Sequence, residues 1–165
     1  MNIRKFCKED FHAVRDIYQQ GIDTGNATFQ KTAKSWEEWD KSMLINCRLI
    51  ATENNQILGW AGLSAVSSRK AYSGVVEVSV YVSEHAQGNG VGQKLLSQLI
   101  IESENNNIWT LQAGIFPENV GSISLHKKNG FRQVGVREKV GEMNGVWRDS
   151  VFMERRSNKV GVSGN

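Results

Sequence analysis

A glycine-rich run, Gln87-Gly88-Asn89-Gly90-Val91-Gly92, is the part of the sequence best suited to bind an anionic ligand. It follows a valine-rich segment with the period of a strand and precedes a segment with the period of a helix. Backbone N–H groups at such a junction point outward beside the positive end of the helix dipole, and glycines lack the β-carbons that would keep a phosphate at a distance. A glycine-rich turn that binds nothing has the same pattern, so the run alone leaves both interpretations open.

Two well-known phosphate loops do not fit this run. A P-loop continues with Gly-Lys-Ser or Gly-Lys-Thr, whereas Gln93 and Lys94 follow here. A dinucleotide fingerprint, Gly-x-Gly-x-x-Gly, that starts at Gly88 or Gly90 requires a third glycine at position 93 or 95, where Gln93 and Leu95 stand. The nucleoside triphosphate and dinucleotide interpretations are therefore weak.

A single carboxylate, Glu77, interrupts the valine-rich segment 75–82. The alternation places Val76, Val78, Val80 and Val82 on one face and Glu77, Ser79 and Tyr81 on the other. A protonated amine must lose a proton before it can attack a carbonyl carbon, and a partly buried carboxylate with a raised pKa could accept that proton. A lone acid on a strand is more often solvated or paired with a base, so this pattern by itself favours no function.

The remaining periodicities predict one α/β (α+β) domain in the order β-α-α-β-β-β-α-β-α-β-β, with a mixed central sheet of about seven strands flanked by helices. The predicted strands cover residues 1–6, 48–53, 57–66, 75–82, 108–116, 131–140 and 146–153. Predicted helices cover 9–20, ending at Gly21, a short segment from 35, residues 90–105, and a segment from 117–119 to Gly130. Ser35-Trp36-Glu37-Glu38 reads as a capping box, and Asn144-Gly145 as a hairpin turn.

The composition fits a single domain with a substantial core, because the 165 residues are 39% hydrophobic and 22% charged. We expect residues 1–154 to form this domain and 155–165 a frayed polar tail. The net charge is +3 and the basic residues form no block, so neither a nucleic acid nor a membrane surface is expected as a partner.

The cysteine pattern and the N-terminus bear on metal sites and location. Cys7 and Cys47 stand in no metal-ligand spacing, which predicts neither a bound metal nor a disulfide. No apolar run approaches the length of a membrane span, and Glu9 and Asp10 occur before a signal-peptide core could form. We therefore expect a cytoplasmic protein.

Two ordered motifs resemble one known family. Gln87-x-x-Gly90-x-Gly92 after a strand resembles the pyrophosphate signature of the GNAT superfamily of acyl-CoA-dependent N-acetyltransferases. Asn119-x-x-Ser122-x-x-Leu125-His126-x-x-x-Gly130-Phe131 resembles the second cofactor motif of that superfamily. The element order predicted above matches the GNAT fold as well, and the resemblance covers about residues 1–153.

Several shorter segments resemble the phosphinothricin acetyltransferase branch, which acetylates the α-amino group of phosphinothricin, methionine sulfoximine or related amino acids. These segments are Asn26-Ala27-Thr28-Phe29, Arg69-x-Ala71-Tyr72, residues 77–82 and 115–119, Ser124-Leu125-His126, and Gly145-x-Trp147-x-Asp149. The resemblance implies acetyl-CoA as co-substrate and direct attack of the acceptor amine in a ternary complex. A Gly-x-Ser-x-Gly nucleophile elbow is absent from the sequence, in keeping with direct attack.

The resemblance also implies which residues bind acetyl-CoA. Backbone groups of the strand would pair with the pantetheine arm and aim an N–H at the thioester carbonyl, while the glycine-rich run would hold the pyrophosphate. Asn119 and Ser122 match positions that contact the pantetheine, although Asn119 is equally suited to cap a helix. The cofactor-binding candidates are Val80, Tyr81, Val82, Gln87, Gly88, Asn89, Gly90, Val91, Gly92, Asn119 and Ser122.

The catalytic candidates are Glu77 and His126. The branch places an acid at the position of Glu77, which makes it the expected base. His126 stands where many superfamily members carry a tyrosine that protonates the departing thiolate, and its role stays open between general acid, second base and cofactor contact.

The substrate-binding candidates are Phe29, Arg69, Tyr72 and Trp147. Arg69 could bind a carboxylate or phosphinate in bidentate fashion, and Phe29 and Tyr72 could wall the acceptor side chain. Trp147, with Asp149, could complete the pocket against a second subunit of a homodimer.

Two alternative functions remain. The acceptor could be another amine, such as a protein N-terminus, a polyamine or an aminoglycoside, although Arg69 and Lys70 disfavour polycationic acceptors. The protein could also be a catalytically silent acyl-CoA sensor, which would need neither Glu77 nor His126.

Overall fold

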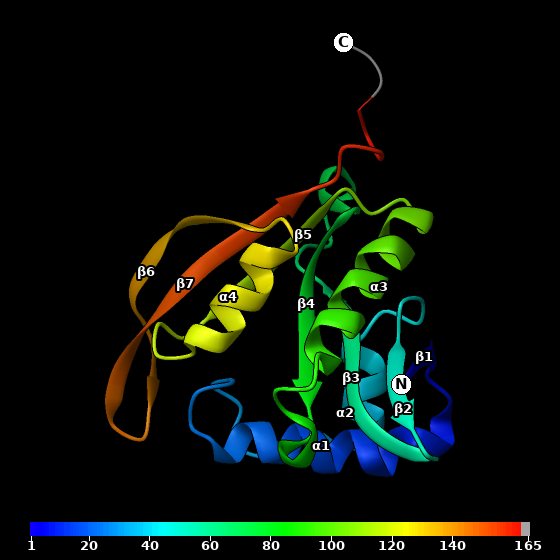
Figure 1. The fold of residues 1–165 in the computed structure, drawn as a ribbon. Helices are drawn as coiled ribbons and strands as arrows, with labels where there is room; N and C mark the ends of the chain where they lie inside the picture. The colour runs from blue at the N-terminus through cyan, green and yellow to red at the C-terminus, as the bar shows by residue number, and fades with distance from the viewer. Residues whose placement is uncertain (163–165) are drawn as a thin grey trace.

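The computed structural model describes residues 1–162, and its elements follow the predicted order (Figure 1). The strands of this part of the chain are β1 (Asn2–Lys5), β2 (Leu49–Glu53), β3 (Gln56–Ala65), β4 (Val75–Val82), β5 (Thr110–Ile115), β6 (Arg132–Met143) and β7 (Val146–Arg156). Its α-helices are α1 (Phe11–Asp23), α2 (Trp36–Ser42), α3 (Val91–Asn105) and α4 (Val120–Lys128). The predicted mixed sheet flanked by helices is confirmed.

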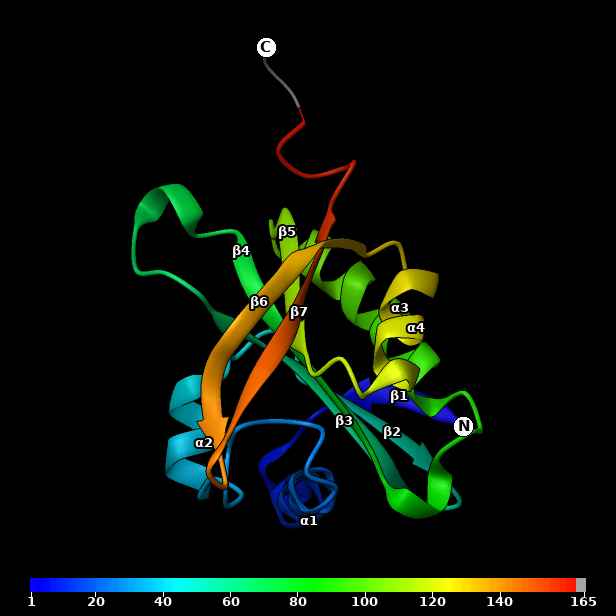
Figure 2. The same cartoon turned by 90° about the vertical axis from the view of Figure 1, so that its left-hand side faces the viewer.

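The sheet opens where its two parallel strands meet. The strand order is β1-β2-β3-β4-β5-β7-β6, and all neighbouring strands are antiparallel except β4 and β5. The parallel pairing joins residues 75–77 of β4 to 110–112 of β5 and then stops, whereas β3 stays paired with β4 as far as Val82. The two parallel strands diverge beyond Glu77, as Figures 1 and 2 show, so that residues 78–82 form one side of a wedge.

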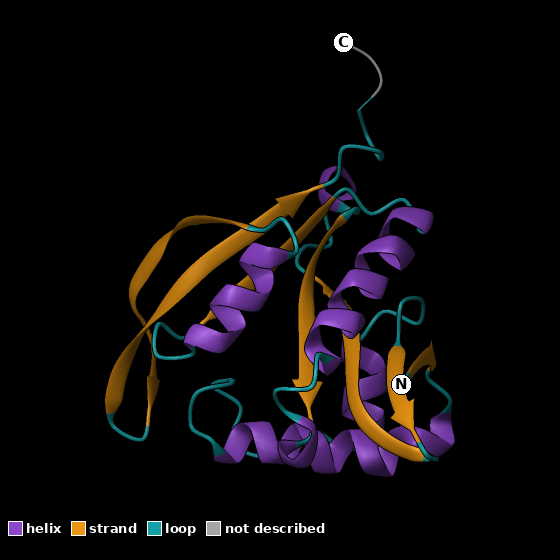
Figure 3. Ribbon diagram, viewed as in Figure 1, coloured by secondary structure: helices purple, strands orange, loops and turns teal. Residues whose placement is uncertain are grey.

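Two helical layers cover the sheet, with α3 and α4 on one face and α1 and α2 on the other (Figure 3). Leu95, Leu96 and Leu99 of α3 are fully buried in the larger core, and each contributes about 1.5–3 kcal/mol by leaving water. The smaller core, on the opposite face, is aromatic and contains Trp39 and Trp60. Because β4 alternates, it contributes valines to the first core and Tyr81 to the second.

Helix α1 continues through Gly21 to Asp23, so the predicted end of this helix is wrong. A β-carbon at position 21 would lie 2.7 Å from the ring of Tyr81, so the glycine permits close packing against β4. Gly21 thus serves tertiary packing, which the sequence signal for the end of a helix does not reveal. By contrast, the predicted capping box of α2 is confirmed, since Ser35 Oγ accepts from the Glu38 N–H and Glu38 Oε1 from the Ser35 N–H.

Strands β6 and β7 form a long hairpin, called the arm here, that projects from the sheet (Figure 1). Its turn is the predicted one, with φ of 52° at Asn144 and 79° at Gly145, values typical of a two-residue hairpin turn. The strands extend beyond their predicted ends, and hydrogen bonds hold residues 157–161 of the tail that was expected to be frayed, while residues 163–165 of that tail lie outside the described residues. Arg156 donates hydrogen bonds to the carbonyl oxygens of Ser157, Val160 and Gly161, which organises the tail as far as the last of these residues.

Residues 1–162 contain neither a candidate membrane-spanning helix nor a cluster of potential metal ligands. No helix in this range combines the length and apolar character that crossing a membrane requires. Within the same range, no three His, Cys, Asp or Glu side chains lie close enough together to hold a metal ion.

Candidate active site

The glycine loop, residues 87–92, joins the end of β4 to the start of α3. Gly88 and Gly90 have φ of +80° and +79°, a left-handed conformation that side chains with a β-carbon rarely adopt. Gly90 is the N-cap of α3 and provides no side-chain cap, so the first backbone N–H groups of the helix remain available for an anion. No heavy atom lies within 4 Å of the position that a β-carbon would take on either glycine, so the loop is open to a ligand.

A groove runs from this loop along β4 to the start of α4, and most cofactor-binding candidates line it. Its lining comprises Gly21, Thr24, Asn26, Ala27, residues 80–82, 86–88, 90–93 and 118–122, Ser124, Leu125 and Lys128. The edge of β4 that faces the groove has lost its β5 partner, so backbone groups there can pair with an extended chain such as pantetheine. Loop, helix N-terminus and unpaired strand edge together fit a diphosphate followed by an amide-bearing arm.

Asn89 is the one cofactor-binding candidate outside the lining of this groove. Its side-chain amide donates to the carbonyl oxygens of Ala86 at 3.3 Å and Gln87 at 3.4 Å. The side chain therefore shapes the loop from within.

Asn119 caps α4 and lines the groove. Its Oδ1 accepts a hydrogen bond from the Ser122 N–H at 3.2 Å, which confirms the predicted cap of α4. Its Nδ2 donates to the carbonyl oxygen of Asn26 at 3.2 Å, while the residue also lines the groove. Asn119 thus links α4 to the loop that follows α1.

A second cavity, of about 690 Å³, lies beside the groove on the Glu77 face of β4. It is lined by Tyr18, residues 27–30, Lys34, Trp39, Ser42, Met43, Trp60, Ser64, Ala65, residues 77–81 and 113–116, Ser122, His126, Arg137, Val140, Gly141 and Ser150. Ala27, Val80, Tyr81 and Ser122 line both the cavity and the groove, so the two lie next to each other beside β4.

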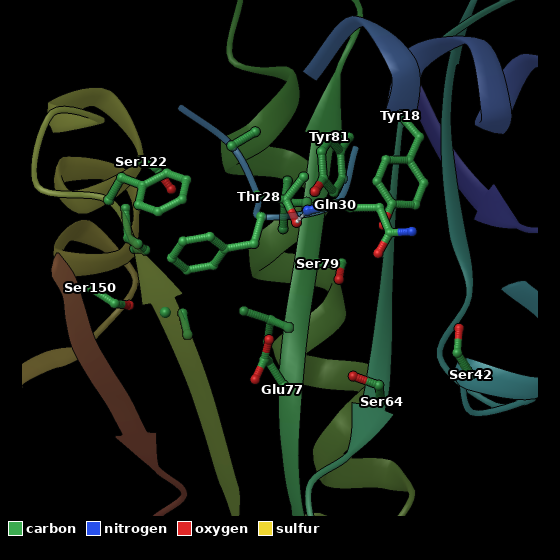
Figure 4. A pocket seen from close by; sticks show the side chains of 18 of the residues that line it. Tyr18, Thr28, Gln30, Ser42, Ser64, Glu77, Ser79, Tyr81, Ser122 and Ser150 are labelled. Carbon is green, nitrogen blue, oxygen red and sulfur yellow. Dashed lines mark hydrogen bonds between the residues drawn. The ribbon is translucent and has the colours of Figure 1, made fainter. Parts of the chain in front are cut away.

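Glu77 lines the cavity and is the last residue of β4 that pairs with β5. It lies opposite Gln112 of β5 and Ser64 of β3. Figure 4 shows its carboxylate beside Ser79 and Ser64, away from the helices behind the sheet. The side chain is exposed, so the expected partial burial is wrong. None of the ion pairs formed among residues 1–162 involves Glu77, which leaves its carboxylate available to a ligand.

His126 is buried at the back of the cavity, with 4% of its surface exposed. Its Nδ1 lies 2.7 Å from the carbonyl oxygen of Ser122. A carbonyl oxygen can only accept, so Nδ1 carries the proton, and in the neutral ring Nε2 presents a lone pair. Burial lowers the pKa of His126, which favours this neutral form at pH 7.

Tyr81 lines the cavity and packs against the aromatic core. Its ring stacks on Trp60 with centroids 5.1 Å apart, and burial raises the pKa of its phenol. Tyr81 therefore stays protonated at neutral pH and serves as a wall with a hydroxyl group.

Of the four substrate-binding candidates, only Phe29 lines the cavity. Its ring meets Phe116 edge-on at 4.8 Å and covers Gly141, where a β-carbon would lie 2.7 Å from the ring. Arg69 and Tyr72 lie outside the lining, with the guanidinium 5.6 Å from the Tyr72 ring, in the loop that precedes β4.

The arm places the other predicted residues away from the cavity. Trp147 is 57% exposed near the tip of the arm and is not part of the lining. Asp149 accepts a hydrogen bond from the Lys139 N–H at 2.8 Å and so holds an irregular part of the arm together.

Two basic residues that the sequence analysis missed line the cavity, Lys34 and Arg137. Lys34 precedes α2, and Arg137 lies on β6, opposite Ser150 of β7. The guanidinium of Arg137 lies 4.7 Å from the ring of Phe152. Neither cation belongs to a recognisable motif, so no local signal in the sequence could have identified it.

Known proteins with similar sequences agree with this geometry. Residues 3–152 match the family model described as an acetyltransferase (GNAT) domain. The chain is 32% identical to phosphinothricin N-acetyltransferase from Alcaligenes faecalis, over 94% of this chain and 82% of that protein. It is 33% identical to L-methionine sulfoximine/L-methionine sulfone acetyltransferase from Salmonella typhimurium strain LT2, over 93% of both chains.

The fold agrees with solved structures as well. A GNAT superfamily phosphinothricin acetyltransferase from Sinorhizobium meliloti, crystallised in complex with acetyl-CoA, superposes with a TM-score of 0.89 and 28% identity. The superposition covers 99% of this chain and 91% of that chain. Sequence, fold and site thus agree, and this chain belongs to the GNAT family of acetyl-CoA-dependent N-acetyltransferases.

Proposed function

We propose that this enzyme transfers the acetyl group of acetyl-CoA to the α-amino group of an amino acid or amino-acid analogue, of the phosphinothricin, methionine sulfoximine or methionine sulfone type. The observation that carries the proposal is that groove and cavity share Val80 and Tyr81 in their walls, with Glu77 in the lining of the cavity alone. The names of the relatives from Alcaligenes faecalis and Salmonella typhimurium support this acceptor class.

The chain's own groups supply a path for direct attack. Bound acetyl-CoA provides the activated acyl group. Glu77 accepts one proton from the acceptor ammonium, directly or through water, so that the nitrogen lone pair can attack the thioester carbon. Backbone N–H groups at residues 80–82 stabilise the negative charge that develops on the carbonyl oxygen. The C–S bond then breaks, and the thiolate takes up the second proton that the nitrogen releases.

His126 is better placed to accept a proton than to donate one. Its Nδ1–H is committed to the Ser122 carbonyl oxygen, and the low pKa leaves Nε2 unprotonated at neutral pH. Among the three roles left open by the sequence, we therefore favour that of a second base, which accepts the second proton from the nitrogen and passes it to the thiolate.

Arg137 is our candidate for binding the acceptor carboxylate, because it combines a cavity position with a planar guanidinium suited to a bidentate pair. Lys34 adds a second positive charge to the cavity wall. Both cations also disfavour a polyamine or aminoglycoside as acceptor.

We further propose that the protein is a cytoplasmic homodimer in which the arm contributes to the interface. Apolar side chains are exposed along the arm, at Val134, Val136, Val146 and Trp147, and exposed apolar patches commonly mark association surfaces. If a partner subunit packs on this surface, Trp147, Arg69 and Tyr72 could bind substrate at the interface, as the resemblance implies.

One screen tests the acceptor class. Thiol release from acetyl-CoA is measured with phosphinothricin, methionine sulfoximine, methionine sulfone, the standard amino acids, an alanine-led peptide, a polyamine and an aminoglycoside. We expect strong turnover with one or a few amino-acid acceptors only. Turnover confined to the peptide or the polyamine would replace the proposed acceptor, and acetyl-CoA binding without any turnover would favour a sensor.

A further inference from the structure

Arg148 of β7 makes an unusual set of contacts between three separate segments. Its Nη1 donates to the carbonyl oxygen of Gly25 at 2.6 Å, and its Nη2 donates to Asn26 Oδ1 at 2.9 Å and to Glu118 Oε2 at 3.1 Å. The guanidinium also covers the Phe116 ring, 3.9 Å from the centroid, and only 13% of the side chain is exposed. One side chain of the arm thus binds the loop after α1 and the junction between β5 and α4.

The loop that Arg148 binds, residues 24–30, forms part of the wall of both ligand sites, and we call it the cap loop. Residues 27–30 line the acceptor cavity, and Asn26 and Ala27 line the cofactor groove. The loop contains neither helix nor strand, so few backbone hydrogen bonds hold its shape. Its contacts with the rest of the protein therefore decide where Phe29 and Thr28 stand in the cavity.

The hydrogen bonds that reach the cap loop from the arm and from the start of α4 converge on Gly25 and Asn26. Arg148 binds both residues, and Asn119 donates to the carbonyl oxygen of Asn26 at 3.2 Å. From there the chain leads directly to Phe29, whose ring packs on Phe116 beneath the same guanidinium. The arm, the cap loop and the start of α4 are therefore joined at one point.

We propose that Arg148 is a positioning residue that latches the cap loop to the start of α4 and thereby sets the affinity for the acceptor. Only a planar guanidinium can donate to three oxygens and stack on a ring at the same time, whereas the ammonium of a lysine is a single flexible donor. The glycine loop, which carries most of the cofactor site, has no contact with Arg148. Loss of the latch is thus expected to affect the acceptor far more than acetyl-CoA.

The kinetic part of this inference rests on the proposed function, and Arg148→Gln tests it. The Gln side chain cannot span the three oxygens, so we expect the KM for the acceptor found in the screen to rise about tenfold or more, with a smaller change in kcat. The Kd for acetyl-CoA, measured by calorimetry, should stay within about threefold of the parent value. Arg148→Lys keeps the charge and one donor, and it should recover part of the acceptor affinity.

Hydrogen exchange in the ligand-free enzyme tests the latch without any acceptor. Backbone amides of residues 24–30 should exchange about tenfold faster in Arg148→Gln, while those of α3 keep the parent rate. Arg132→Gln is the matched control, because Arg132 lies on the same arm, is 67% exposed and pairs only with Glu154. This control should match the parent enzyme in exchange, KM and Kd.

The outcomes separate the latch from the proposed function. An enzyme that acetylates no amino acid would overturn the proposed acceptor, while faster exchange of the cap loop would still support the latch. Parent-like exchange of residues 24–30 together with a parent-like KM would overturn the latch in an active enzyme. If Arg148→Gln does not fold, Asn26→Ala replaces it, since this variant removes one acceptor of the latch from an exposed loop residue and should shift exchange in the same direction.

Discussion

The two walls of the cleft bind their ligands in different ways. The cofactor wall consists of a contiguous glycine loop, a helix N-terminus and a strand edge, all of which offer backbone groups. The acceptor wall takes side chains from α1, the cap loop, α2, α4, three strands of the sheet and the arm. Backbone recognition requires a local conformation that a short motif can specify, whereas the acceptor wall exists only after distant segments have packed. This difference explains why acetyl-CoA is easier to infer than its acceptor.

The largest effect is expected from Glu77→Gln, which leaves the cofactor wall intact and removes the base of the acceptor wall. General bases contribute about 10²–10⁴-fold to a rate, so kcat at pH 7 should fall by a factor in this range. The Kd for acetyl-CoA, measured by calorimetry, should not change, because the amides of the glycine loop are untouched.

Glu138→Gln is the control for this prediction, because Glu138 is an exposed carboxylate on β6 that does not line the cavity. It should leave kcat at the parent value. A kcat for Glu77→Gln equal to that of the parent enzyme would remove Glu77 from the mechanism and leave His126 as the only catalytic candidate.

A pair of arginine variants sharpens the comparison within the acceptor wall. If Arg137 binds the acceptor carboxylate, Arg137→Gln should raise the KM for the acceptor about 10–100-fold, the range expected from a lost charge-assisted hydrogen bond. Arg69→Gln should have a smaller effect, because Arg69 lies outside the cavity of this chain. Steady-state kinetics with the best acceptor from the screen would measure both. A larger effect at Arg69 would instead indicate that a second subunit completes the pocket.

Gly90→Val tests the cofactor wall alone. Valine in a left-handed conformation costs about 1–2 kcal/mol, so the loop should change shape and acetyl-CoA affinity should fall about 5–30-fold. Calorimetry measures this loss, and Gly135→Ala is the control, because position 135 on β6 has open space around it and no left-handed φ. Parent-like affinity in Gly90→Val would contradict the role of the glycine loop as the pyrophosphate site.

Much of the fold, and less of the site, could be predicted from the sequence. The alternation of β4 and the turn at Asn144-Gly145 are local patterns, and the structure confirms both. The end of α1 was predicted wrongly because Gly21 is required for close packing against the ring of Tyr81, a contact that forms only in the folded chain. The burial of Glu77 was also predicted wrongly, because the divergence of β4 from β5 exposes its side chain.

The missed residues share one physical property. Lys34 lies more than a hundred residues before Arg137 and Arg148, which both belong to the arm, and packing of the arm against the cap loop brings these segments together. Arg148 resembles an ordinary charged residue of an exposed strand until its contacts with Gly25 and Glu118 are known. Side chains that act through such long-range contacts carry no motif.

The smallest expected effect concerns stability and comes from His126, which is buried in the acceptor wall. Burial lowers the pKa of His126 below its ordinary value of 6.5, so at lower pH the unfolded chain binds a proton that the folded chain resists. The free energy of unfolding should therefore be insensitive to this group above pH 6.5 and should decline below it, by at most about 1.4 kcal/mol per pH unit. Urea titrations of the parent and His126→Gln between pH 5 and 8 would measure the decline, which the variant should lose. His12→Gln, at a histidine whose side chain is 91% exposed, should retain it. An equal decline in the parent and His126→Gln would mean that His126 is not held neutral, and the argument for a second base would fail with it.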